Sequence, residues 1–212
     1  MSVPVASVPL PAVAPGAPRT LTVSSRLKPG SGPTRLRVPD LLHATDQAAD
    51  HVLSGRFDQL LPEGGVPESK RWFTRIDGDE ELDIWLISWV PGHATELHDH
   101  GGSLGALTVV SGSLNEFRWD GRGLRRRRLD AGDQAGFPLG WVHDVVWAPR
   151  PVPRPPTEAP TEAPTKAAAP VQPTLSVHAY SPPLTAMSYY DVTDRNRLRR
   201  QRTELTDQPE GS

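Results

Sequence analysis

The sequence predicts an all-β-dominated domain, a sandwich or small barrel, with a helix packed on its outside. From Arg71 onward, short alternating apolar segments are separated by Gly, Asp and Pro, which is typical of many short strands. These segments are RWFTRI, ELDIWLISWV, LGALTVVSGSL, NEFRW, GLRRRRL, WVHDVVW and TLSVHAYSPP. The helix is predicted over residues 40–53, where apolar side chains recur at roughly helical spacing and Gly55 follows as a stop.

Proline and glycine mark the segments that are expected to lie outside the core. The chain has 24 Pro and 18 Gly among 212 residues, well above the usual combined share of about 12%. The Pro-, Ala- and Val-rich residues 1–38 predict a disordered or loosely attached arm. Residues 149–173 contain a TEAP repeat and predict a disordered, polyproline-like insertion. We therefore expect one domain over residues 39–192, interrupted by this insertion, and a charged flexible tail over residues 193–212.

The composition argues against several classes of function. A formal net charge of -2 gives no global field toward nucleic acid or anionic membranes. The chain has no cysteine, which excludes a disulfide framework, a thiolate metal site and a cysteine nucleophile. The start of the chain does not resemble a signal peptide, and the arginine runs at 125–128 and 197–202 are flanked by acidic residues. We expect a cytoplasmic monomer that binds neither nucleic acid nor membranes.

Two histidines are spaced as metal ligands on a strand. In ELHDHGG, His98 and His100 are separated by one residue, so on a strand both imidazoles project from the same face and can converge on one ion. Asp99 would then point away from that ion. The alternative for so short a pattern is two exposed histidines near a turn.

The surroundings of this pair resemble the two-part signature of the cupin superfamily. The first part is a glycine, five residues, His-x-His and a later glycine; the second is a glycine, five residues, Pro-x-Gly, two residues and a histidine. The positions are filled by Gly92, His98, His100 and Gly112, and by Gly132, Pro138, Gly140 and His143. The resemblance implies a small jelly-roll β-barrel in which His143 completes a metal site with His98 and His100. Ligand type alone leaves Fe(II), Zn(II), Mn(II) and Ni(II) open.

One departure from most cupins narrows the resemblance to cysteine dioxygenase and its thiol dioxygenase relatives. Most cupins carry a glutamate ligand four or five residues after the His-x-His pair, whereas this chain has GGSLG there, with Gly105 at the glutamate position. A site of three histidines without a carboxylate is similar to that of the thiol dioxygenases. The chain resembles the bacterial members, because the cysteine that animal members cross-link to a tyrosine is absent.

The segment FTRIDGDEELDIWLISWVPG resembles the family's segment before the metal strand. It places Arg75 where the family has the arginine that binds the substrate carboxylate. A guanidinium fork suits that role, because it binds a carboxylate bidentately and keeps its charge. The alternative is a surface arginine paired with Asp77 or Glu80. Phe73 stands where animal members have a tyrosine.

The segment SVHAYSPP resembles the family's Ser-His-Tyr hydrogen-bond chain. Ser176, His178 and Tyr180 lie at i, i+2 and i+4, so a strand projects them from one face. The resemblance implies that they orient the tyrosine hydroxyl toward substrate and dioxygen. The alternative is an ordinary solvent-facing strand surface. The insertion before this segment is not a recognised family feature.

The resemblance, which covers roughly residues 71–190, implies an Fe(II)-dependent enzyme with one Fe(II) per chain. L-cysteine would be oxidised by O2 to cysteine sulfinic acid. Dioxygenation of 3-mercaptopropionate or another small thiol is the alternative within the class, although those relatives usually carry glutamine where Arg75 stands. From other classes, a non-catalytic metal-binding or small-molecule-binding cupin, or a Zn/Mn isomerase, would leave the Ser-His-Tyr pattern unexplained.

Overall fold

The computed structural model describes residues 35–149 and 172–209. Most of the predicted arm (1–38) and nearly all of the predicted insertion (149–173) lie outside these residues. Within the described ranges, no helix combines the length and the apolar character that crossing a membrane requires.

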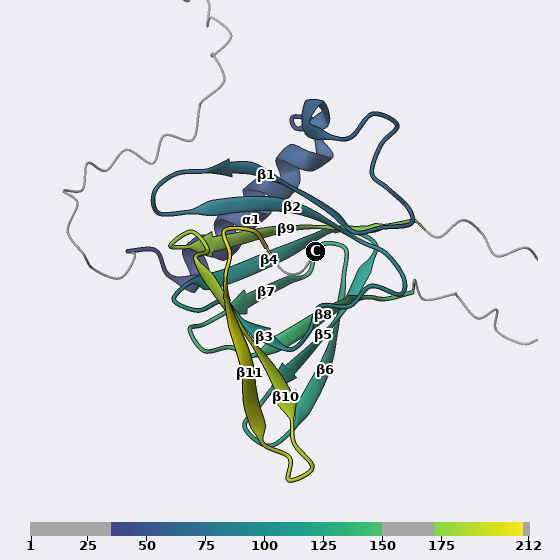
Figure 1. Ribbon diagram of the computed structural model, residues 1–212. Coiled ribbons are helices and arrows are strands. Elements are labelled where there is room, and N and C mark those ends of the chain that lie inside the picture. Colours follow the sequence, from purple (N-terminus) through teal and green to yellow (C-terminus); the bar gives the residue numbers. More distant parts are fainter. Residues whose placement is uncertain (1–34, 150–171, 210–212) are drawn as a thin grey trace, which may run out of the picture. The chain divides into compact units, whose positions relative to one another are not determined.

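The strands of the described residues form two antiparallel sheets (Figure 1). The order in the five-stranded sheet is β1 (Trp72–Gly78), β2 (Asp83–Trp89), β9 (Thr174–Ser181), β4 (Leu104–Ser111) and β7 (Gln134–Phe137). The order in the six-stranded sheet is β11 (Leu198–Leu205), β10 (Ala186–Val192), β3 (His98–Asp99), β8 (His143–Trp147), β5 (Ser113–Trp119) and β6 (Leu124–Asp130). The predicted all-β architecture is therefore confirmed.

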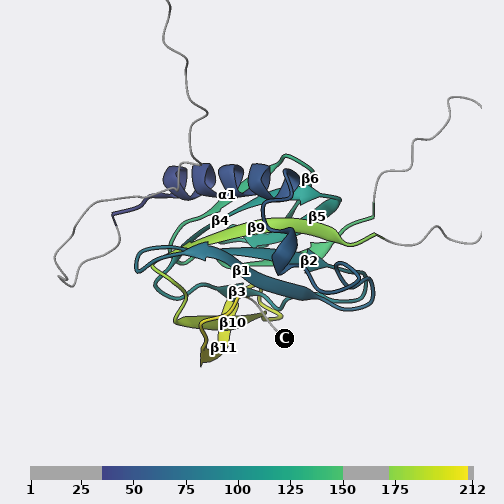
Figure 2. The ribbon, with the colours of Figure 1, turned by 90° about the horizontal axis from the view of Figure 1, so that it is seen from above.

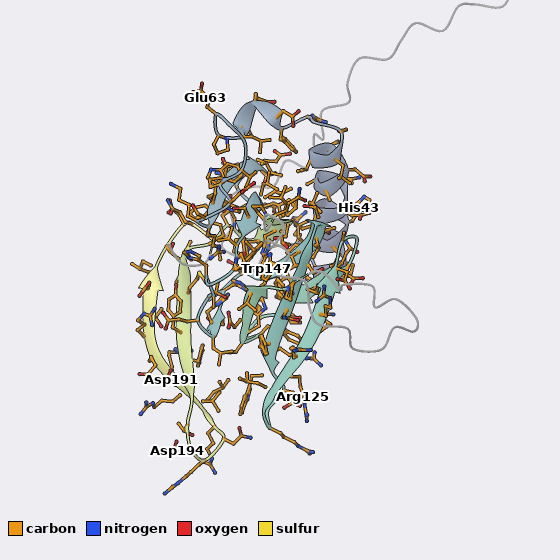
Figure 3. The ribbon with its side chains drawn as sticks, turned by 90° about the vertical axis from the view of Figure 1, so that its right-hand side faces the viewer. His43, Glu63, Arg125, Trp147, Asp191 and Asp194 are labelled. Carbon is orange, nitrogen blue, oxygen red and sulfur yellow. The ribbon has the colours of Figure 1, made fainter. Side chains whose placement is uncertain are left out.

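One apolar core joins the two sheets. Ile87 and Leu107 from the five-stranded sheet cluster with Leu114 and Val145 from the six-stranded sheet, and each is at most 1% exposed. Burial of such side chains is the main favourable term in folding. Arg125 on β6 and Asp191 on β10 are charged residues at exposed, outer positions (Figure 3).

The helix α1 (Val38–Leu53) covers the outer face of the five-stranded sheet (Figure 2). It begins two residues before the predicted start, because the Asp40 carboxylate accepts a hydrogen bond from the Arg37 backbone N–H at 2.7 Å and caps the first turn. Leu41 is fully buried in a second core with Leu86 of β2. A short 3-10 helix, η1 (Asp58–Leu60), follows. The predicted outside helix is confirmed.

The predicted flexible tail differs from what the structure shows. Within residues 193–212, Leu198–Leu205 form β11, which pairs with β10 along its whole length, for example Tyr189 with Arg202. The strand lies at the edge of its sheet and its side chains are almost all exposed. Its sequence therefore lacks the apolar alternation that reveals a half-buried strand.

Candidate metal centre

Two neighbouring strands of the six-stranded sheet position the three predicted histidines. His98 begins β3, His100 follows that strand directly, and His143 begins β8, where it is paired with His98. The side chains are 0%, 4% and 0% exposed, and the three offer ligand atoms that all lie within 4.8 Å of one another. Asp99 is engaged elsewhere, since its carboxylate accepts a hydrogen bond from the Tyr190 hydroxyl at 2.6 Å. The three buried histidines could hold a metal ion.

The second nitrogen of two of these rings is occupied by an oxygen acceptor. His98 Nδ1 lies 2.6 Å from the Glu96 carbonyl oxygen, and His143 Nδ1 lies 3.1 Å from Glu116 Oε1. An acceptor at Nδ1 fixes the proton there and leaves the lone pair on Nε2, which is the form that binds a metal. Both Nε2 atoms are buried. The donor set therefore fits a divalent transition metal such as Fe(II), Zn(II) or Mn(II).

Glu116 is a functional candidate that the sequence analysis missed. Its side chain is fully buried, and its second oxygen accepts hydrogen bonds from Arg127 Nε and Nη2 at 3.2 and 2.8 Å, while Trp141 Nε1 donates to Oε1 at 3.2 Å. Burial would raise the pKa of Glu116, but the hydrogen bonds and the cationic partner outweigh it and lower that pKa to about 2. The sequence did hold one sign of its burial: Glu116 follows the core residue Leu114 by two positions, and i and i+2 share a strand face.

The residues Ser176, His178 and Tyr180 form a buried hydrogen-bond chain on β9. Ser176 Oγ lies 3.0 Å from His178 Nε2, and His178 Nδ1 lies 3.3 Å from Tyr180 Oη. Trp89 Nε1 donates to Ser176 Oγ at 2.8 Å. Because Trp89 donates to Ser176 Oγ, the serine hydroxyl can donate in turn to His178 Nε2, and His178 Nδ1–H can donate to Tyr180 Oη. In this arrangement the tyrosine proton points away from His178. The His100 and Tyr180 rings are 4.9 Å apart between centroids, so the chain ends beside the metal-site histidines.

Arg75 lies on β1 and is paired with a buried acid that was not among its expected partners. Its Nη2 is 2.6 Å from Asp83 Oδ1, with side-chain exposures of 46% and 5%. Burial raises the pKa of Asp83, and the Arg75 charge offsets part of that rise. Arg75 also donates from Nε to the Asp77 carbonyl oxygen at 3.4 Å.

One family model matches part of the chain. Residues 66–137 match the family model of cysteine dioxygenase type I. This match supports a cysteine dioxygenase-type cupin. It includes Arg75, His98 and His100, and it ends before His143 and β9.

The other comparisons give no close relative among curated proteins and only low similarities among solved structures. No curated protein matches the sequence. Similar solved structures include KdgF from Halomonas sp. (16% identity, 55% of this chain and 84% of that chain, TM-score 0.39). They also include a double-stranded β-helix protein from Klebsiella pneumoniae (18%, 59% and 85%, 0.40) and the polyketide cyclase RemF from Streptomyces resistomycificus (14%, 62% and 80%, 0.42). At these identities and scores, the likenesses carry no argument about function.

An aromatic ring occupies the space next to Gly105, the position at which the sequence analysis noted the missing glutamate. A Cβ atom added at Gly105 would lie 2.9 Å from Phe137 Cδ2 and 3.4 Å from Tyr180 Cδ1. The Phe137 ring packs on His143, with 4.2 Å between centroids. A glutamate at Gly105 would collide with this packing, and the metal cluster among the described residues contains no carboxylate.

Proposed function

We propose that this chain is a cysteine dioxygenase, which adds both atoms of O2 to the sulfur of L-cysteine and gives cysteine sulfinic acid. The observation that carries the proposal is the buried His98–His100–His143 cluster without a carboxylate, with Tyr180 beside it. The family match over residues 66–137 supports the same class of reaction. The reaction balances as RSH plus O2 giving RSO2H.

The three histidines would hold Fe(II), which when bound lowers the pKa of the substrate thiol and keeps both reactants in one coordination sphere. Because His98 and His143 already carry their protons on Nδ1 against Glu96 and Glu116, their Nε2 lone pairs need no rearrangement to bind the ion. The Phe137 ring on His143 keeps apolar surface next to the site.

Tyr180 would donate a hydrogen bond to the reacting groups. His178 and Ser176 act as positioning residues, because they hold the tyrosine oxygen and direct its proton. All three side chains are fully buried, so this hydrogen bond acts where water does not compete.

Arg75 would anchor the substrate carboxylate, which favours L-cysteine over thiols without a carboxylate. A guanidinium has five N–H donors; the contacts with Asp83 and with the Asp77 carbonyl oxygen involve Nη2 and Nε, and neither involves Nη1. We also place the reaction in the cytoplasm, because a reducing compartment keeps the substrate as a thiol.

Dioxygen uptake by the Fe(II)-loaded protein tests the proposal. The protein would be offered L-cysteine, 3-mercaptopropionate and cysteamine in turn, with the sulfinic acid product measured alongside. We expect the highest kcat/KM for L-cysteine. Tyr180→Phe should lower kcat on the order of 10²-fold, the usual effect of losing one such donor, with the metal content retained. Uptake with none of the three thiols would refute the proposal.

A further inference from the structure

The edge strand β11 carries two arginines that each contact a different tyrosine of β10. Arg200 and Arg202 are two positions apart, so on a regular strand they would share one face. The register shifts between them, because Arg202 pairs with Tyr189 whereas Arg200 pairs with the next residue, Tyr190. Such a bulge re-aims a side chain. Since consecutive strand residues project to opposite faces, the two arginines reach opposite faces of the sheet.

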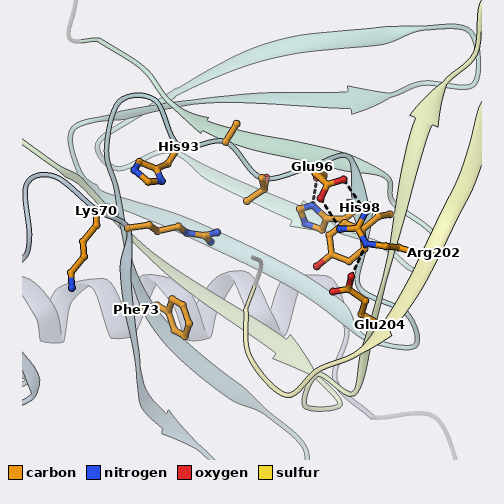
Figure 4. Close-up of a pocket in the computed structure, with 11 residues that line it drawn as sticks. Lys70, Phe73, His93, Glu96, His98, Arg202 and Glu204 are labelled. Atoms are coloured by element: carbon orange, nitrogen blue, oxygen red, sulfur yellow. Dashed lines mark hydrogen bonds and ion pairs between the residues drawn. The ribbon is translucent and has the colours of Figure 1, made fainter. Parts of the chain in front are cut away.

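Arg202 binds the residue whose backbone orients His98. It donates from Nη1 and Nη2 to the two carboxylate oxygens of Glu96 at 2.9 and 2.6 Å, and from Nε to Glu204 at 2.6 Å (Figure 4). The carbonyl oxygen of Glu96 lies 2.6 Å from His98 Nδ1. Arg202 Cζ also lies 3.9 Å from the centroid of the Tyr189 ring, a cation–π contact. Exposed ion pairs contribute little when they are isolated, but a bidentate pair within a network is an exception.

Tyr190 binds the residue that lies between two of the candidate ligands. Its hydroxyl donates to Asp99 Oδ2 at 2.6 Å, and Arg200 donates to the same hydroxyl from Nε and Nη2 at 3.3 and 3.1 Å. The other carboxylate oxygen of Asp99 accepts a hydrogen bond from the Gly101 backbone N–H at 2.9 Å. Asp99 is 6% exposed. This series of bonds therefore fixes the chain on both sides of His100.

The strand β3 needs such support because it is short. It has two residues, and it pairs with β8 at one position and with β10 at two. We propose that Arg202 and Tyr190 are positioning residues for the metal centre, which hold β3 through Glu96 and Asp99, the residues on either side of the segment 97–98. The inference rests on the proposed metal-dependent function and gives the hairpin of β10 and β11 a part in building its site.

Metal titration of the full-length protein tests this role without turnover. The parent, Arg202→Gln and Tyr190→Phe would be titrated with Fe(II) and with Co(II) against a competing chelator, and the visible absorption of bound Co(II) reports the geometry of its ligands. Arg199→Gln is the matched control, because Arg199 also lies on β11 and its partner is Asp191 of β10, at 3.6 Å. The Tm of each metal-free variant is measured alongside.

We expect Arg202→Gln and Tyr190→Phe each to weaken metal binding about three- to tenfold, less than the roughly 10- to 100-fold usual for a direct partner of a ligand. Both should alter the Co(II) absorption, which a loss of stability alone would not do. Arg202→Lys should recover little of the affinity, because an ammonium lacks the planar fork. The Kd of Arg199→Gln should stay within about twofold of the parent value, as expected where no contact with β3 is lost.

Two outcomes would overturn the inference. Parent-like affinity or a parent-like Co(II) spectrum in both variants shows that neither residue positions the histidines. An equal loss in Arg199→Gln shows that the effect comes from the charge or stability of the hairpin. A parent protein that binds neither metal refutes the metal centre of the proposed function itself, and that result is separable because it appears before any substitution is made.

Discussion

Glu116 connects a metal-site histidine to the solvent-exposed side of the six-stranded sheet. Its Oε1 lies 3.1 Å from Nδ1 of the buried His143, while its Oε2 is held by Arg127, whose side chain is 49% exposed. A carboxylate in this position orients the imidazole and makes it a better ligand. Metal binding by His143 would therefore depend on Glu116, which is not itself part of the histidine cluster.

We expect Glu116→Ala to weaken metal binding about 10- to 100-fold, the usual effect of removing such a support. Glu116→Gln should lose less, because its amide oxygen can still accept from His143. Titration of the apoprotein with Fe(II) or Co(II) against a competing chelator measures both. Equal affinity in Glu116→Ala and in the exposed-loop control Glu80→Ala would contradict the role.

The Arg75–Asp83 pair predicts a specific change in titration. Burial raises the pKa of Asp83 and Arg75 opposes the rise, so Arg75→Ala should raise that pKa further. An acid whose folded-state pKa is raised loses stability as pH rises from its unfolded value, near 3.8, through the folded value. The variant should therefore lose more stability over that window. Carboxyl NMR titration measures the pKa, and a value that stays the same or falls would contradict the pairing.

At the scale of elements, most of the strands and the helix could be predicted because their apolar residues alternate or recur at helical spacing. β7, β10 and β11 are not among the predicted strands, since β7 is short and β11 is a charged edge strand without apolar alternation. The three candidate metal ligands were predicted from the spacing of His98 and His100 together with the resemblance to the cupin signature, which added His143. The place of Glu116 could not be predicted, because it depends on strand register and on the side chains that pack around it.

The helix α1 should contribute strongly to stability through one buried leucine. Leu41 is fully buried against the five-stranded sheet, and Gln134 of β7 donates to the Leu42 carbonyl oxygen at 2.9 Å. Leu41→Ala should cost about 2–5 kcal/mol of unfolding free energy, measured by urea denaturation. Leu53→Ala, at a position 69% exposed, should stay within about 0.5 kcal/mol of the parent. Similar losses in both variants would show that α1 is not docked in this way.

At the scale of the whole molecule, metal binding and folding should be coupled. An ion that binds only the folded state at a thousand times its Kd stabilises that state by about 4 kcal/mol, so a divalent metal should raise the Tm and a chelator should reverse the rise. His143→Ala should abolish most of the shift. Thermal unfolding with and without chelator measures it, and a full shift in the variant would place the ion elsewhere.

The strand that carries His98, β3, is paired with its neighbour β8 at a single position. β3 has two residues, and its register with β8 consists of the His98–His143 pair alone, although β10 continues the sheet on its other side. Backbone amides at such a seam open locally at low free energy. His98 and His143 are also candidate metal ligands, so an ion bound by both would link β3 to β8. Metal binding should then slow amide hydrogen exchange in β3 and β8 far more than in β9, which is paired along its full length on both sides.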